Sequence, residues 1–315
     1  MYIEKIHIDE LKKLELRSVF NSMEWISIYN PKELVLLGIF NKNKELIGAF
    51  YYTKHKRVKV LTHIAPPFLS PHCGLWMDDK TSNPAQKNTF KKKVFKLIID
   101  HLKLLNYDVI SLPFPAENID MQSFIWDGFE VSPKYTYQID LTQTEEEILA
   151  KMSSNRRKNI KKAQKEDILT QFSLKNKSSE ELIENTFVKQ NLNYDKEVLN
   201  SIFNDFSNDE NSFSFTSFKN EKPLATVFCI CDKEVAYYIL GGYNIANSHE
   251  GAGALAMWSA IQYAKKKGVK TFDFEGSMHP PIEKYFRGFG GEIVPYYSVG
   301  KSNIMGKTLL KIRKK

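Results

Sequence analysis

The fold is decided by residues 235–277, VAYYILGGYNIANSHEGAGALAMWSAIQYAKKKGVKTFDFEGS. This segment opens with an apolar strand pattern over 235–240. Glycines at 251 and 253 then precede a run of apolar residues at helical spacing, and a second short strand pattern follows over 270–274. A strand, a glycine-containing loop, a helix and another strand, in this order, predict an α/β unit.

The same order of elements occurs twice in the chain. Each copy begins with three apolar strands joined by polar turns. In the first copy the strands are expected over 34–40, 46–52 and 58–64, with turns at 41–45 and 54–57. In the second copy they are expected over 213–218, 223–231 and 235–240. Lys42 lies 177 positions before Lys219, and after the two helices Phe124 lies 162 positions before Phe286. A run of matches at constant lag predicts a duplicated unit.

Helix signals occupy the stretch between the copies. Thr142 or Thr144, followed by three glutamates, predicts a helix start, and the helix is expected to continue through the basic run Arg156 to Lys165. Further helices are expected from Ser178 and over 196–206. We predict an α/β (α+β) protein with two domains, 1–140 and 141–315, each a mixed and mostly antiparallel sheet flanked by helices.

Composition excludes several classes of protein. The chain has 315 residues, of which 42% are hydrophobic, and this excludes general disorder. Its apolar stretches are too short to span a bilayer, and three cysteines exclude a disulfide scaffold. The formal net charge of +8 permits phosphate-bearing partners without being a nucleic-acid signature. We expect a cytoplasmic protein, with no metal because His and Cys lack ligand spacing.

Three segments resemble the FemAB-like branch of the GNAT acyltransferase superfamily, which includes peptidoglycan-bridge aminoacyltransferases and acetyltransferase-like domains. They are Tyr137–Leu141 with Ser154–Ala163; Gly241-Gly242-Tyr243 with Gly251–Leu255, Trp258 and Tyr263–Lys265; and Gly268–Ser277 with Phe286–Glu292. The resemblance implies two tandem GNAT-like domains. It further implies transfer of an acyl or aminoacyl group from acyl-CoA or aminoacyl-tRNA to an amine, in a cell-wall or polysaccharide precursor, with no permanently bound cofactor.

The chain also departs from the bridge-building enzymes at two positions. Their terminal motif has a lysine where this chain has Phe286, preceded by Tyr285, and an early lysine is replaced by Tyr29. Lys284 and Arg287 flank the first of these positions. The departures weaken the expectation of tRNA-dependent cell-wall transfer and favour a thioester donor slightly. They also keep open an alternative, a catalytically inactive binding module for a phosphorylated glycan or nucleic acid.

Gly251, Ala252 and Gly253 are the predicted donor-binding residues. Glycines at a helix start allow a phosphate to approach the backbone, where the helix dipole favours negative charge. The alternative is that the glycines serve tight packing. The matching loop of the first copy has no glycine, so we expect a degenerate donor site there.

Asp273, Glu275, Tyr243 and Tyr285 are the predicted catalytic residues. Alternation at a strand end predicts that Asp273, Glu275 and Ser277 point to one face, where a carboxylate accepts a proton from the attacking ammonium. Glu275 is the preferred base, and Asp273 has the alternative of a structural cap. The two tyrosines are expected to line a cleft between the domains and to protonate the leaving group, whereas Phe289 is expected in the core.

Basic residues give the predicted substrate contacts, namely Arg156, Arg157, Lys161, Lys284 and Arg287. The first three belong to one helix, whose face suits a phosphate-bearing small molecule, a precursor or tRNA. The alternative is an ordinary solvated helix face. For the basic carboxyl-terminal residues 307–315, a solvated end is favoured over contact with an anionic membrane.

Overall fold

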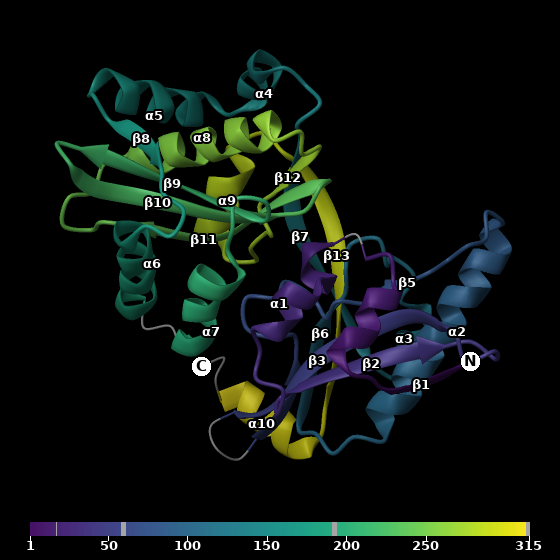
Figure 1. The fold of residues 1–315 in the computed structure, drawn as a ribbon. Coiled ribbons are helices and arrows are strands. Elements are labelled where there is room, and N and C mark those ends of the chain that lie inside the picture. Colours follow the sequence, from purple (N-terminus) through teal and green to yellow (C-terminus); the bar gives the residue numbers. More distant parts are fainter. Residues whose placement is uncertain (17, 58–60, 191–193, 313–315) are drawn as a thin grey trace. The chain divides into compact units, whose positions relative to one another are not determined.

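A computed structural model describes residues 1–16, 18–57, 61–190 and 194–312 (Figure 1). The chain separates into two compact units. The first contains Met1–Lys134 and the chain from Pro295 onward, and the second contains Tyr135–Val294. The chain passes between them within two strands, β7 (Glu130–Asp140) and β13 (Glu292–Ser302).

The first unit is built on a sheet with the strand order β1-β2-β3-β4-β6-β13. Its other strands are β1 (Tyr2–Lys5), β2 (Leu34–Phe40), β3 (Leu46–Arg57), β4 (Leu61–Ala65), β5 (Trp76–Met77) and β6 (Val109–Pro113). Its helices are η1 (Ile8–Lys13), η2 (Val19–Asn21), α1 (Met23–Ser27), α2 (Pro84–Lys103), α3 (Gln122–Trp126) and α10 (Ile304–Ile312). Helix α2 begins at an Asn83 cap followed by proline, and it buries Val94, Ile98 and Leu102 in the main core of this unit.

The second unit has the strand order β7-β12-β11-β10-β9-β8. These strands are β8 (Leu169–Phe172), β9 (Ser212–Lys219), β10 (Lys222–Cys231), β11 (Val235–Tyr243) and β12 (Thr271–Asp273), with β7 described above. The helices are α4 (Glu145–Lys151), α5 (Ser154–Lys165), α6 (Lys177–Lys189), α7 (Lys196–Ser201), the π-helical turn η3 (Ile202–Phe206), α8 (Ala252–Lys266) and α9 (Pro280–Arg287). Figure 1 shows α5 and α8 on one face of this sheet and α6 on the other.

Each unit contains one parallel strand pair joined through a long helix. His63 and Ile64 of β4 pair with β6, and Val235 to Tyr237 of β11 pair with β12. Parallel neighbours require a crossover connection, which α2 and α8 supply. The remaining pairings in both units are antiparallel, apart from one strand junction that is not described. The predicted fold class, two α/β units with mixed and mostly antiparallel sheets, is therefore confirmed.

Several local expectations were wrong. Residues 54–57, predicted as a turn, continue β3 and pair with β4, while residues 58–60 of the predicted third strand lie outside the described residues. The helix expected from 145 to 165 is two helices, because Ser153 caps α5 by accepting a hydrogen bond from the Arg156 N–H. Strand β8 was not predicted.

The compact units also differ from the predicted limits of 1–140 and 141–315. The chain from Pro295 onward belongs to the first unit, because Ser298 to Ser302 of β13 pair with β6. Backbone pairing between segments this far apart in sequence leaves no trace in composition, and the predicted limit followed only the order of the two copies.

Two equivalent glycines of the repeat give a matched stability test. Gly128 and Gly290 both have positive φ, +75° and +80°, which disfavours any other residue. A Cβ on Gly290 would also lie 2.4 Å from the Lys151 carbonyl oxygen, whereas the nearest atom at Gly128 is 4.0 Å away. We expect Gly128→Ala to lower the free energy of unfolding by about 1–2 kcal/mol and Gly290→Ala by about 2–4 kcal/mol. Urea unfolding measures both, and equal losses would contradict the described packing.

Candidate functional site

Strand β11 has an open edge in the second unit. Its pairing with β12 covers only Val235 to Tyr237, because β12 ends at Asp273 while β11 continues to Tyr243. Beyond Tyr237, no strand among the described residues pairs with this edge. The pairing with β10 is irregular at the same place and leaves Ile239 without a partner, as in a β-bulge. An unpaired strand edge offers N–H and C=O groups to an extended ligand.

The corresponding gap of the first unit is filled by its own chain. The Tyr51 N–H donates to the Cys73 carbonyl, and the Cys73 N–H donates to the Pro113 carbonyl. Strand β5 continues this segment beside Gly48 and Ala49 of β3. Of the two copies, it is therefore the second whose parallel pair has an open edge within the described structure.

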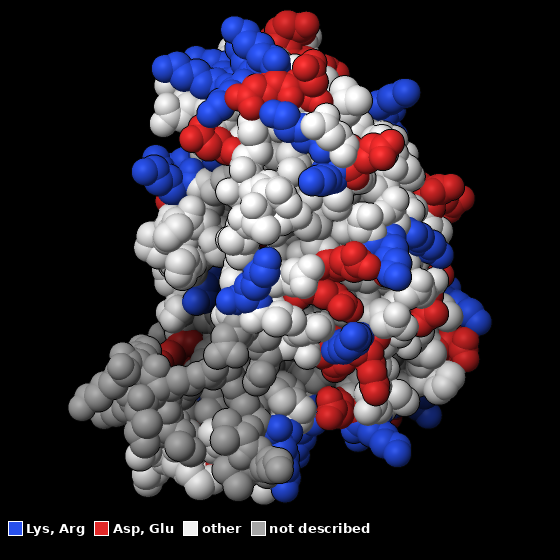
Figure 2. Space-filling view, turned by 90° about the vertical axis from the view of Figure 1, so that its left-hand side faces the viewer, with Lys and Arg blue, Asp and Glu red and all other residues white. Residues whose placement is uncertain are grey.

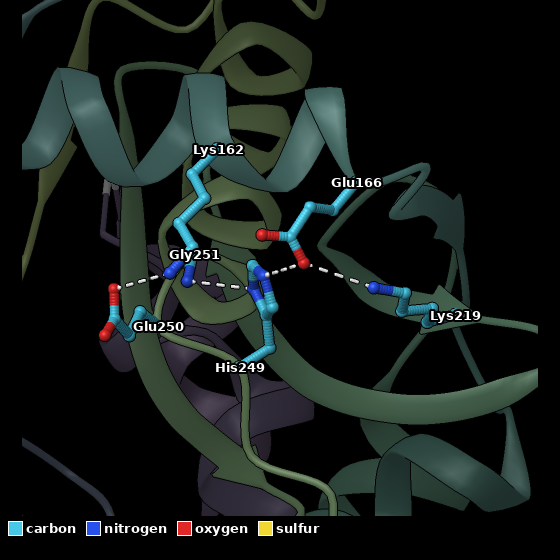
Figure 3. Close-up of polar contacts among 6 residues, drawn as sticks. All are labelled: Lys162, Glu166, Lys219, His249, Glu250 and Gly251. Atoms are coloured by element: carbon cyan, nitrogen blue, oxygen red, sulfur yellow. Dashed lines mark hydrogen bonds and ion pairs between the residues drawn. The ribbon is translucent and has the colours of Figure 1, made fainter.

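Helix α8 packs against β9 and β10 and begins with some N–H groups paired and others free (Figure 3). The His249 ring accepts a hydrogen bond from the Gly251 N–H through Nδ1 at 3.0 Å, and the His249 carbonyl accepts from the Ala252 N–H at 3.2 Å. No acceptor among the described residues is bonded to the N–H groups of Gly253 and Ala254. These two groups, at the positive end of the helix dipole, remain available to an anion.

Charged side chains fix the loop that leads into α8. Glu166, at the end of α5, contacts the His249 ring at 3.3 Å and Lys219 at 3.2 Å, and Lys162 pairs with Glu250 at 3.1 Å (Figure 3). The hydrogen bond from Lys219 holds the pKa of Glu166 below its usual value. These contacts join the loop to α5 and β9, so the start of α8 is held in place before any ligand arrives.

The two glycines at this helix start have different explanations. A Cβ on Gly251 would lie 2.2 Å from the Asn159 carbonyl oxygen, so Gly251 allows α5 to pack against α8. A Cβ on Gly253 would meet nothing closer than the Tyr285 hydroxyl at 3.5 Å. Tight packing therefore accounts for Gly251, while Gly253 faces the tyrosine with room to spare.

Tyr285 of α9 places its hydroxyl at the start of α8. Its ring stacks under the Arg156 guanidinium, whose carbon lies 4.1 Å from the ring centroid, and contacts Phe286 and Phe289. Burial raises the pKa of Tyr285 to about 12, against a smaller lowering by Arg156. Burial also raises the pKa of Tyr238, and charge on the Tyr285 hydroxyl raises it further, so the two hydroxyls are neighbours. Tyr238 lies on β11 beside the bulge, and sequence reasoning missed it because nothing in an apolar strand pattern separates it from core residues.

Asp273 and Glu275 do not share a face as expected. Strand β12 ends at Asp273, and Glu275 has φ of +56°, so the alternation of a strand stops between them. Asp273 is 5% exposed and accepts hydrogen bonds from Thr136 at 2.5 Å, from Gln138 at 2.7 Å and from the Glu275 N–H at 2.7 Å. It is thus a structural carboxylate, although burial raises its pKa.

Glu275 has the opposite surroundings. No donor among the described residues bonds its carboxylate, which keeps some contact with solvent. Protein atoms nevertheless surround it densely, and this burial, followed by the charge of Asp273, raises the pKa of Glu275 well above its usual value. An unpaired carboxyl group with a raised pKa is a suitable general base.

Of the basic residues predicted to contact substrate, some are bonded within the protein and others are exposed to solvent. Arg156 donates to the Tyr285 carbonyl at 3.1 Å, and Arg157 donates to the carbonyls of Ala150 and Met152 at the end of α4. Both arginines therefore hold helices together. Lys161 is exposed without an ion pair in the described structure, and Figure 2 shows basic side chains gathered where Figure 1 places α5, with acidic ones among them.

The other predicted residues lie around α9 and the end of β11. Lys284 is exposed, and Arg287 pairs with Glu283 at 2.8 Å, which also accepts a hydrogen bond from Tyr137. Tyr243 is 48% exposed at the last position of β11. Phe289 is buried in the core as expected. In the parts of the chain that are described, no three His, Cys, Asp or Glu side chains form a metal-binding group, and no helix is long and apolar enough to cross a membrane.

Comparison with known proteins agrees with this geometry. Residues 179–287 match the model of an acetyltransferase (GNAT) domain, a span that contains β11, the start of α8 and Tyr285. This part of the second unit is therefore similar to GNAT acetyltransferase domains. No curated protein sequence matches the chain.

Solved structures extend the similarity to the whole fold. The chain is similar to the crystal structure of FemX, with 12% identity, complete coverage of both chains and a TM-score of 0.65. It is similar to the carboxyl-terminal domain of a putative lysylphosphatidylglycerol synthetase from Agrobacterium fabrum, with 10% identity, 96% and 95% coverage and a TM-score of 0.62. The chain is also similar to a tandem GNAT protein from the clavulanic acid biosynthesis pathway. The identity is 9%, the coverage is 95% of this chain and 97% of the other, and the TM-score is 0.52. The expected resemblance is confirmed for the GNAT domain by the family model and for the fold by the solved structures.

The two glycines of α8 provide a test of the site's packing. We expect Gly251→Ala to lower the free energy of unfolding by about 2–3 kcal/mol, because the new Cβ overlaps the Asn159 carbonyl. Gly253→Ala should leave it unchanged or raise it by up to about 1 kcal/mol, since alanine is the better helix former. Urea unfolding of the two variants measures this, and a larger loss in Gly253→Ala would refute the assignment.

Proposed function

We propose that the second unit is an N-acyltransferase that moves an acyl or aminoacyl group from a thioester or ester donor to an amine. One observation carries this proposal: the hydroxyl of the half-buried Tyr285 lies at the start of α8 and close to Tyr238 of β11, the strand with the open edge. A donor extended along that edge brings its leaving atom to an acid. The match of residues 179–287 to an acetyltransferase domain supports the same reaction class.

The open edge and the helix start suit two donor classes. An acyl-CoA would pair its extended arm with β11 and place phosphate at the free N–H groups of Gly253 and Ala254. An aminoacyl-tRNA would present its terminal ester to the same edge, and FemX and the lysylphosphatidylglycerol synthetase domain share the fold. The exposed lysines of α5, among them Lys161, are placed to contact phosphate of either donor or of a phosphate-bearing acceptor.

The chemical step follows from the groups at this edge. The acceptor ammonium gives a proton to Glu275, directly or through water, and the free amine attacks the donor carbonyl carbon. Backbone N–H groups of β11 stabilise the oxyanion that forms. As the carbon–sulfur or carbon–oxygen bond breaks, Tyr285 protonates the leaving atom. The nitrogen of the new amide gives its extra proton to water, and Tyr285 regains a proton through that water.

Tyr285 is expected to act as the general acid. Its pKa of about 12 keeps it protonated at neutral pH, as a proton donor must be. We expect Tyr285→Phe to lower kcat by roughly 10²-fold or more with a smaller change in donor binding. The matched control is Tyr263→Phe on α8, whose ring packs against Phe213 and Phe215 away from the open edge. Steady-state kinetics with a thiol-release assay measures both, and an unchanged kcat in Tyr285→Phe would remove the proposed acid.

Glu275 is expected to set the acidic limb of the pH profile. As a base it works only when deprotonated, so the rate should rise as the pH passes its pKa, which burial places well above that of an ordinary glutamate. Tyr285 should cause no alkaline loss below about pH 12. In Glu275→Gln we expect kcat to fall roughly 10²-fold and this limb to disappear, while acceptor binding survives. Glu181→Gln, on the exposed face of α6, is the control. A profile unchanged by Glu275→Gln would exclude Glu275 as the base, whereas no turnover in the unchanged protein would favour the binding-module alternative.

The donor class is tested by binding. Calorimetry with acetyl-CoA and with charged tRNA distinguishes the two, and Gly253→Ala should weaken only a donor whose phosphate approaches the α8 backbone. Failure of both donors to bind the full chain would overturn the proposed reaction.

A further inference from the structure

A second concave site lies entirely in the first unit. It is a cavity of about 650 Å³ between the first half of α2, the segment around β5 and the loop that follows β6. This volume falls within the range of small-molecule sites, roughly 300–1,000 Å³. None of its lining residues belongs to the site around Tyr285.

One wall of the cavity holds a buried polar atom without a partner. Asn118 is 2% exposed, and its amide nitrogen donates to the Pro115 carbonyl at 3.4 Å. Its Oδ1 atom, in contrast, receives no hydrogen bond in the described structure. A buried acceptor left unsatisfied is destabilising, so a native chain retains one where a ligand or water supplies the donor.

Three charged residues of the lining, Glu15, Lys91 and Glu117, form no ion pair in the described structure. Most charged groups there are paired, for example Lys87 with Asp79 at 3.4 Å and Lys80 with Asp78 at 3.1 Å. Lys91, half-buried on α2, forms no ion pair or hydrogen bond in the described structure, and Glu117, adjacent to Asn118, forms no ion pair. Lys91 and Glu117 are near enough for the lysine to affect the glutamate electrostatically, yet they do not join. Lys91, Glu117 and Asn118 thus offer one cation, one anion and one neutral acceptor, and the exposed Glu15 adds a second anion to the lining.

The cavity also has apolar lining residues. Leu46, Leu75, Trp76 and Met77 line it, with Trp76 and Met77 held in place by the pairing of β5 with β3. Burial of a ligand's apolar group against these residues adds affinity in proportion to the area removed from water.

We propose that this cavity binds an α-amino acid with an apolar side chain in its zwitterionic form. The ammonium donates to the Glu117 carboxylate and to Asn118 Oδ1, and the carboxylate accepts from Lys91. The side chain packs against Trp76 and its apolar neighbours. A purely anionic or purely cationic ligand would pair with charges of one sign only, whereas a zwitterion pairs with both Lys91 and Glu117. The proposal does not depend on the acyltransferase reaction, because every group it uses belongs to the first unit.

Charge-deleted ligands test the proposal on the unchanged protein. We expect calorimetry of the full chain to detect saturable binding of L-phenylalanine or L-leucine, and the same ligand to raise the melting temperature. L-Phenylalaninamide lacks the anion and N-acetyl-L-phenylalanine lacks the cation, and each should bind roughly tenfold or more weakly than L-phenylalanine. No binding of either amino acid at about 10 mM, above the millimolar limit of weak affinity, would overturn the proposal, as would equal binding of the amide.

Variants then assign the contacts. Lys91→Met and Glu117→Gln should each weaken L-phenylalanine binding roughly tenfold or more, whereas Lys93→Met, exposed on the same helix and absent from the cavity wall, should not. Urea unfolding without ligand identifies a variant that has simply lost stability. Equal affinity in Lys91→Met and Lys93→Met would refute the role of Lys91. Acetyl-CoA binding at the second unit should persist in all three, which separates failure here from failure of the proposed reaction.

Discussion

The three-residue parallel contact between β11 and β12 is the constraint on which the candidate site depends. Because β12 stops at Asp273, the longer β11 is left with an open edge. Three hydrogen bonds hold the Asp273 carboxylate, and the next residues turn sharply through positive φ at Glu275 and Gly276. A side chain at Gly276 would lie 2.0 Å from the Tyr135 carbonyl oxygen, so the turn runs against β7. The chain then re-enters as α9 and delivers Tyr285 to the start of α8.

Both units contain a short parallel strand pair, but the chain beside that pair differs between the two units. In the first, the segment around Cys73 and β5 bonds to both flanking strands and fills the gap. This segment occupies backbone groups of both strands that an extended donor would otherwise use. Leu75, Trp76 and Met77 of the same segment also line the cavity proposed to bind an amino acid. One piece of chain therefore contributes to both differences between the units.

Much of the fold was predictable from the sequence because turns and periodicity are local signals. Strand β2 and helices α4, α6 and α8 begin within a residue of the expected positions. The candidate site was predictable only in part. The sequence predicted correctly that Tyr285 lies on a segment after the short strand β12. The prediction that Asp273 and Glu275 share one face was wrong, because the strand ends at Asp273. Strand ends depend on tertiary hydrogen bonds, here from Thr136 and Gln138, which lie more than a hundred residues away in sequence.

The basic helix α5 shows most clearly what a charge pattern leaves undecided. Its two arginines stand directly before its lysines in the sequence, yet the arginines turn inward: Arg156 stacks on Tyr285 and Phe289, and Arg157 binds the last carbonyls of α4. A guanidinium is more weakly hydrated than an ammonium and suits such stacked, half-buried positions. The groups left for a phosphate are exposed lysines and backbone N–H groups. These act as point charges and dipoles without the bidentate geometry of arginine, so any phosphate recognition at this end should be sensitive to salt and tolerant of ligand shape.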